Sequence, residues 1–265
     1  MKNYDELPLE ILSKLDNKPY EVINVGLSGA EVRRYDDFVL KIQPHTEQSV
    51  NEVAFMRYLK GKVLAPEVAE YEMQDGKDYL LMSKLDGDML CADKFLANQT
   101  LLFEKAGEIL FALWKLPINE CPCDMRLERK LSIARHNVEH NNVDLNLVNP
   151  KLLGVKGWFK TPEALLQWLI DNKPREDLCV SHGDFCLPNI IVCGNNVGVI
   201  DFPYGGVADR YCDIALFCRS VKSNLRGEYG GKTYAEFDEK LFFDVLNLKP
   251  DFDKIDYYIL LDELF

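Results

Sequence analysis

The chain has 265 residues, of which 47% are hydrophobic and 28% are charged, a composition typical of a globular protein with one or two lobes. Its formal net charge of −12 argues against a nucleic-acid partner bound through phosphates, and it is compatible with a small cationic substrate. No apolar run is long enough to span a membrane and residues 1–16 lack the apolar core of a signal peptide, so we expect a cytoplasmic protein without a membrane partner.

Hydrophobic periodicity in the first third predicts a small, mostly antiparallel sheet with one packed helix. After a short helix at 8–15, the expected strands lie at 21–25, 30–35, 38–42, 67–72 and 79–82. The helix is expected at 47–59, with an apolar face of Val50, Val53, Ala54 and Phe55. The loop Gly26-Leu27-Ser28-Gly29 between the first two strands can bring backbone N–H groups close to phosphates.

Two charged residues in this part form a candidate phosphate-binding pair. Lys41 stands in the third predicted strand, and Glu52 follows eleven residues later on the predicted helix. Either residue alone is more simply read as a surface charge. A strand lysine paired with a helix glutamate is, however, the arrangement that holds nucleotide phosphates in kinases.

The predicted secondary structure changes from mainly strands to mainly helices near residues 83–88, where we place the boundary between two lobes. Residues 1–87 are predicted as a nucleotide-binding lobe, and residues 88–265 as a catalytic and substrate-binding lobe. Helices are expected at 98–116, 128–137 and 161–171, so the second lobe reads as helical except for one hairpin. Residues 83–85, at the lobe junction, would offer backbone groups to a purine ring, which makes Ser83 and Leu85 candidate nucleotide contacts.

The hairpin carries the most informative pattern in the chain. Asp184 and Asn189 have the D-x-x-x-x-N spacing of a kinase catalytic loop, in which the aspartate faces the substrate hydroxyl and the asparagine holds magnesium. Apolar strands at 190–193 and 197–200 flank a turn at Gly194, and Asp201 follows the second strand. Because the two ends of a hairpin lie about 5 Å apart, Asn189 and Asp201 are predicted to share a magnesium site beside Asp184.

Other patterns have simpler explanations. His136 to His140 fits the H-x-x-E-H motif of a zinc protease, but its polar surroundings favour a solvated helix end. His182 precedes the catalytic loop and is interpreted as a hydrogen-bonded scaffold residue. The eight cysteines lie mostly in apolar runs without a C-x-x-C pair, which favours free thiols over a zinc ribbon.

Together these residues resemble the aminoglycoside O-phosphotransferase family, which has a two-lobed, α+β, protein-kinase-like fold. The segments 207–215 and 257–265 are most similar to the 3′-phosphotransferase branch, whose members inactivate kanamycin and neomycin. The resemblance implies a small antiparallel-sheet N-terminal lobe, a mainly helical C-terminal lobe, and use of Mg²⁺ with ATP or GTP to confer antibiotic resistance. It implies the following roles: Asp184 as the catalytic residue, Asn189 and Asp201 as magnesium ligands, Lys41 on the phosphates, Glu52 orienting Lys41, and Ser28 on the β-phosphate. Asp262, Glu263 and the carboxylate of Phe265 would bind ammonium groups of a small, cationic aminosugar.

The chain departs from the family pattern at three places. The family follows the second metal-binding aspartate with x-Gly-Arg, whereas this chain has Phe202-Pro203-Tyr204 and so lacks a cation there. An aromatic residue that stacks on the purine in the family falls at Val39, and the substrate loop at 144–158 carries two lysines and only one acidic residue. Two alternatives therefore stay open: a related small-molecule kinase with a different acceptor, and a weakly active nucleotide-binding homologue.

Overall fold

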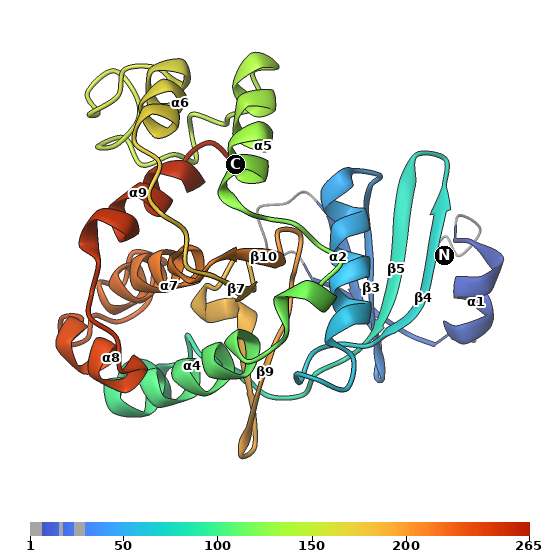
Figure 1. Ribbon diagram of the computed structural model, residues 1–265. Coiled ribbons are helices and arrows are strands. Elements are labelled where there is room, and N and C mark those ends of the chain that lie inside the picture. Colours follow the sequence, from blue (N-terminus) through green and yellow to red (C-terminus); the bar gives the residue numbers. More distant parts are fainter. Residues whose placement is uncertain (1–6, 16–17, 24–29) are drawn as a thin grey trace.

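The computed structural model describes residues 7–15, 18–23 and 30–265 of the chain. The N-terminal part is a five-stranded antiparallel sheet in the order β1-β2-β3-β5-β4, with α1 and α2 on opposite faces (Figure 1). Its elements are α1 (Leu9–Leu15), β1 (Glu21–Ile23), β2 (Glu31–Arg34), β3 (Phe38–Pro44), α2 (Glu47–Leu59), β4 (Val68–Gln74) and β5 (Lys77–Ser83). The described strand bounds lie within two residues of the predicted ones, and α2 matches its predicted range. The predicted end of the first strand, at 24–25, lies outside the described residues.

Alternation along the strands explains which residues face α2. Leu40 and Ile42 in β3 pack with Ile11 of α1 in a small cluster on one face of the sheet. Lys41, between them, therefore points to the opposite face, where α2 lies. Val50 is 43% exposed and does not belong to the buried face of α2, contrary to the predicted apolar stripe.

The larger C-terminal part is mainly helical and holds most of the core. Its helices are α3 (Asp93–Leu96), α4 (Gln99–Trp114), α5 (Leu127–Glu139), α6 (Pro162–Asp171), α7 (Arg210–Leu225), α8 (Glu239–Leu246) and α9 (Phe252–Asp262). Short 3₁₀ turns lie at Ile118–Glu120 and Leu187–Asn189. Phe55 and Leu59 of α2 belong to the same buried cluster as α4, α7 and α9, so this core continues into the N-terminal lobe. Within the residues that the structure describes, no helix is both long and apolar enough to cross a membrane.

The predicted hairpin is present as β8 (Ile190–Cys193) and β9 (Asn196–Val199). The expectation that the rest of this lobe is helical was wrong in one respect, because three further strands are present. They are β6 (Asp88–Met89), which extends the hairpin, and β7 (Leu178–Ser181) paired with β10 (Gly206–Asp209). The β7–β10 pair holds the chain before Asp184 beside the chain after Asp201, so the two segments predicted to be catalytic converge.

Candidate active site

Asp184 sits on a loop between β7 and β8, where its carboxylate is restrained at both oxygens. The Cys186 thiol donates to Oδ1 at 3.1 Å, and Asn189 Nδ2 donates to Oδ2 at 3.0 Å. Gly183, just before it, has φ +87°, and a Cβ there would lie 2.0 Å from the Tyr204 carbonyl oxygen. Burial raises the pKa of Asp184. The loop therefore presents a basic, fixed carboxylate, as a residue that orients a hydroxyl and accepts its proton requires.

A buried carboxylate that sequence reasoning missed holds this loop in place. Asp213 of α7 accepts hydrogen bonds of 2.9 Å from the Ser181 hydroxyl and from the backbone N–H groups of His182 and Gly183. A His182 ring nitrogen lies 3.0 Å from the Ile200 carbonyl oxygen, which links the loop to the end of β9. His182 thus has the scaffold position that its sequence context predicted. Asp213 gave no local signal, because its donors come from residues about thirty positions earlier.

The structure brings the two predicted magnesium ligands to neighbouring ends of the hairpin. The Ile200 N–H donates to the Asn189 carbonyl at 3.0 Å, and Asp201 follows directly. Because Asn189 Nδ2 is turned toward Asp184, its Oδ1 faces away and has no hydrogen-bond partner among the described residues. The Asp201 side chain is 42% exposed. An amide oxygen and an accessible carboxylate form a donor set that suits Mg²⁺ with a bound phosphate.

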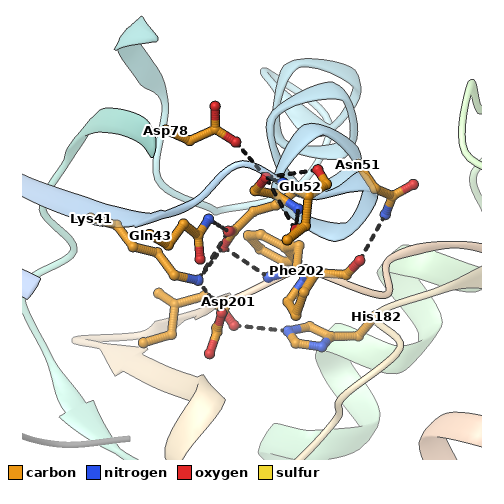
Figure 2. Close-up of polar contacts among 12 residues, drawn as sticks. Lys41, Gln43, Asn51, Glu52, Asp78, His182, Asp201 and Phe202 are labelled. Atoms are coloured by element: carbon orange, nitrogen blue, oxygen red, sulfur yellow. Dashed lines mark hydrogen bonds and ion pairs between the residues drawn. The ribbon is translucent and has the colours of Figure 1, made fainter. Parts of the chain in front are cut away.

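Lys41 and Glu52 meet as the sequence pattern predicted, and Asp201 joins them (Figure 2). Lys41 Nζ lies 2.9 and 3.1 Å from the Glu52 carboxylate oxygens and 2.8 Å from Asp201 Oδ1. Burial disfavours the ammonium, but the two carboxylates outweigh it and keep the pKa of Lys41 above its ordinary value. Lys41 is therefore a fixed cation that lies between the sheet and the predicted metal site.

The residues predicted to contact the purine and the β-phosphate are only partly described, and some of their polar groups already have partners in the protein. Ser28 lies outside the described residues. The Ser83 N–H donates to the Glu67 carbonyl, and its hydroxyl accepts from the Glu67 N–H, so both groups are already engaged. Leu85 has no backbone hydrogen bond within the described chain, which leaves its N–H and carbonyl available to a base. Val39 pairs with Met82 in the sheet.

The three C-terminal residues predicted to bind ammonium groups lie at the end of α9, close to Asp184. Asp262 contacts Arg219 of α7 at 2.5 Å, and Glu263 accepts a 2.6 Å hydrogen bond from the Asn149 N–H of the substrate loop. Burial raises the pKa of Glu263. The Phe265 ring packs edge-on against Tyr204, with centroids 5.0 Å apart. Two of the carboxylates predicted to bind the acceptor, Asp262 and Glu263, thus already have partners within the protein.

Tyr204 occupies the position where the family has an arginine. It lines a small cavity together with Gly183, Lys130, Asp262 and Phe265. Burial, with Asp262 and other nearby carboxylates, raises the pKa of its hydroxyl to about 12. Tyr204 is therefore a neutral residue on the acceptor side, and it brings no positive charge to the phosphates.

The zinc-protease pattern on α5 does not form a comparable site. The His136 and His140 rings lie 4.0 Å apart, and His140 Nδ1 is 2.8 Å from the His136 carbonyl oxygen. Over residues 7–15, 18–23 and 30–265, no group of three His, Cys, Asp or Glu residues is arranged to hold a metal ion. Among those residues, His136 and His140 thus have no third side chain with which to bind zinc.

Comparison with known proteins agrees with the geometry. The model of the phosphotransferase enzyme family matches residues 19–248. An aminoglycoside 3′-phosphotransferase of Campylobacter jejuni is 33% identical over 276 aligned residues, which cover 100% of both chains. The chain belongs to the phosphotransferase enzyme family.

Other members of the family extend the likeness. An aminoglycoside 3′-phosphotransferase of Niallia circulans is 35% identical, with 97% of each chain covered. The solved structure of a Streptomyces rimosus aminoglycoside phosphotransferase with ADP and streptomycin has a TM-score of 0.73 at 24% identity, over 96% of this chain and 95% of the other. These matches confirm the resemblance to the 3′-phosphotransferase branch and the two-lobed α+β fold. The roles of individual residues, and the lobe boundary at residue 87, stay predictions.

Proposed function

We propose that the protein transfers the γ-phosphoryl group of ATP or GTP to a hydroxyl of an aminoglycoside antibiotic, the 3′-hydroxyl, and so confers resistance. The observation that carries this proposal is the Asp184 carboxylate, held by Asn189 at 3.0 Å beside the Lys41–Asp201 pair. Relatives that match over the whole chain carry the name aminoglycoside 3′-phosphotransferase, which supports the acceptor class.

In this proposal, Asp184 orients the acceptor hydroxyl and accepts its proton as the new O–P bond forms. The bond between the γ-phosphorus and the β–γ bridging oxygen breaks, and the nucleoside diphosphate leaves. The transition state of phosphoryl transfer is loose, so catalysis depends mainly on positioning and charge stabilisation. The donors from Cys186 and Asn189 restrict rotation of the carboxylate, which favours a single alignment of the hydroxyl.

On the nucleotide side, Lys41 contacts the α- and β-phosphates, and Glu52 keeps its ammonium in place. Ser28 contacts the β-phosphate, while Ser83 and Leu85 lie beside the purine. Asn189 and Asp201 would hold Mg²⁺, which would supply positive charge to the phosphate oxygens. Their oxygen donors fit that ion, as described above.

On the acceptor side, Asp262, Glu263 and the carboxylate of Phe265 bind ammonium groups of the aminosugar. Charge-assisted hydrogen bonds of this kind are about twice as strong as neutral ones. The last residue of α9 and the three residues after it therefore select a cationic acceptor and present its hydroxyl to Asp184.

The test is nucleotide turnover with magnesium, with and without kanamycin, in the native protein, Asp184→Ala and Asp256→Ala. Asp256 is an exposed residue of α9 and serves as a matched control. We expect kanamycin-dependent turnover that Asp184→Ala abolishes and Asp256→Ala retains, with the phosphate on the 3′-oxygen by NMR. Turnover that kanamycin does not stimulate would contradict the proposal.

A second candidate is a small-molecule kinase whose acceptor is not an aminoglycoside. It is favoured by the contacts of Asp262 with Arg219 and of Glu263 with Asn149, which already pair two of the predicted ammonium-binding carboxylates. Nucleotide binding without stimulation by kanamycin, combined with turnover on another hydroxyl compound, would support it.

A further inference from the structure

The backbone at Asp201 has a conformation that needs support from outside its own segment. Its φ is +68°, in the left-handed region that residues with a side chain rarely adopt. Such a conformation costs about 1–2 kcal/mol and persists only where neighbouring contacts hold it. The segment that follows, Phe202-Pro203-Tyr204-Gly205, is also where this chain departs from the family pattern.

One face of α2 supplies those contacts. The Asn51 amide nitrogen donates to the Pro203 carbonyl at 3.2 Å and to the Gly205 carbonyl at 2.9 Å, and Figure 2 shows this side chain reaching toward the segment. The neighbouring Glu52 lies 3.4 Å from the Phe202 N–H. The consecutive side chains of Asn51 and Glu52 thus hydrogen-bond to the backbone of residues 202–205.

Packing leaves the segment little freedom to move away from α2. The Phe55 ring, one turn after Asn51, lies 5.7 Å from the Phe202 ring between centroids. A Cβ placed on Gly205 would come within 2.3 Å of the Phe55 ring, so the backbone there packs directly against that side chain. The apolar contacts fix the distance between helix and segment, and the Asn51 amide fixes its orientation.

The chemistry of Asn51 matches this task. The Pro203 and Gly205 carbonyl oxygens both face the Asn51 side chain. A carboxamide can donate to both, because its nitrogen carries two N–H groups. An aspartate of the same shape would place a carboxylate against both carbonyls. Neither the Lys41–Glu52 pair nor the catalytic loop requires an amide here, so the asparagine is unexplained by the contacts described earlier.

We propose that Asn51 is a positioning residue for the metal site: it holds the backbone after Asp201 so that the Asp201 carboxylate points toward the cation. This inference rests on the proposed function in one respect, the assignment of Asp201 as a metal ligand. In this proposal, α2 positions both charged side chains of the nucleotide site. Glu52 positions Lys41, which contacts the phosphates, and Asn51 positions Asp201, which contacts the metal ion.

The test measures metal binding directly and needs no acceptor. Binding of Mn²⁺ to the protein with ADP is followed by electron paramagnetic resonance of free Mn²⁺, and ADP binding without metal is followed by calorimetry. Asn51→Asp and Asn51→Ala are compared with Val50→Ala, an exposed neighbour on the same helix. We expect the Mn²⁺ Kd to rise about tenfold in both Asn51 variants, the effect of losing two neutral hydrogen bonds. Metal-free ADP affinity should stay close to that of Val50→Ala, whereas the Tm should fall by a few degrees because the two hydrogen bonds are also lost without metal.

A Mn²⁺ Kd within twofold of the native value in both Asn51 variants would overturn the inference. So would an equal loss of metal-free ADP affinity, because that result would indicate a general structural role. Asp201→Ala separates this inference from the proposed function. If Asp201→Ala weakens Mn²⁺ binding and the Asn51 variants do not, the role of Asn51 alone is refuted. If Asp201→Ala has no effect, the metal assignment itself is wrong.

Discussion

Replacing Lys41 by methionine tests whether the Lys41–Glu52 pair is the energetic centre of the nucleotide side. The change removes the ammonium and keeps a side chain of similar length. Glu52 is 1% exposed, and its remaining contacts would be the Gln43 amide at 3.2 Å and the Phe202 N–H at 3.4 Å. Lys41→Met therefore leaves a buried carboxylate with two weak donors in place of a cation.

Removing one partner of a buried ion pair costs about 3–5 kcal/mol, because the other charge stays buried and uncompensated. The lost contact with Asp201 adds little, since its side chain is 42% exposed and pairs of that kind contribute about 0–1 kcal/mol. We therefore expect Lys41→Met to lower the free energy of unfolding by about 3–5 kcal/mol. The double variant Lys41→Met/Glu52→Leu, which removes both charges, should fall within about 1 kcal/mol of the native protein.

The assay is urea-induced unfolding of both variants, with Lys240→Met as the control. Lys240 pairs with Asp244 on the surface with 87% of its side chain exposed, so its replacement should change stability by less than about 0.5 kcal/mol. Burial raises the pKa of Glu52 against the opposing effect of Lys41. Removal of Lys41 raises it further, so Lys41→Met should regain stability as the pH falls and lose it as the pH rises. If the double variant is as unstable as the single one, buried charge is not the cause and the reasoning fails.

Three further predictions concern the catalytic loop and α9. Burial raises the pKa of Asp184 in the folded state, so its charged form destabilises the fold above the unfolded-state pKa. Asp184→Asn should therefore be inactive but should unfold at a higher temperature at pH 7. This difference in stability should vanish below about pH 4, where the carboxyl is protonated in both states. Lys254→Met leaves the fully buried Asp209 without its 2.7 Å cation, so urea unfolding should show a loss of about 3 kcal/mol, and a loss under 1 would contradict this. Gly183→Ala forces a Cβ against the Tyr204 carbonyl at positive φ, and steady-state kinetics should show kcat reduced at least tenfold; unchanged kcat would refute the strain.

Local patterns predicted the elements whose chemistry lies within a few residues. The range of α2 followed from its helical periodicity, and its N-terminus is fixed by the capping box of Thr46 and Ser49. The β8–β9 hairpin followed from Gly194 and the flanking apolar strands, which set both its turn and the neighbouring ends that carry Asn189 and Asp201. These features need no knowledge of the rest of the chain.

What the sequence could not predict depends on partners far away along the chain. The strands β7 and β10 are only four residues each, and their paired residues lie 25 to 31 positions apart in the chain. The pair is stabilised by packing of β7 against α4 and α7. Asp213 reads as a polar residue of a helix until the loop at 181–183 folds onto it. Asn51 likewise reads as a solvated position of α2, because the carbonyls that it binds lie about 150 residues later.

The contacts of Lys41 suit the two roles that the proposed function gives this site, binding the phosphates and binding the metal ion. Its ammonium is shared between Glu52, which is buried, and Asp201, which is partly exposed. A magnesium nucleotide offers each charge a stronger partner: a phosphate for Lys41 and a divalent cation for Asp201. In the proposed function, a bound magnesium nucleotide would replace the 2.8 Å contact between Lys41 and Asp201, and Glu52 at 2.9 Å would keep the ammonium in place. The proposed function thus assigns the buried Glu52 to holding the Lys41 ammonium, and the partly exposed Asp201 to binding the metal ion.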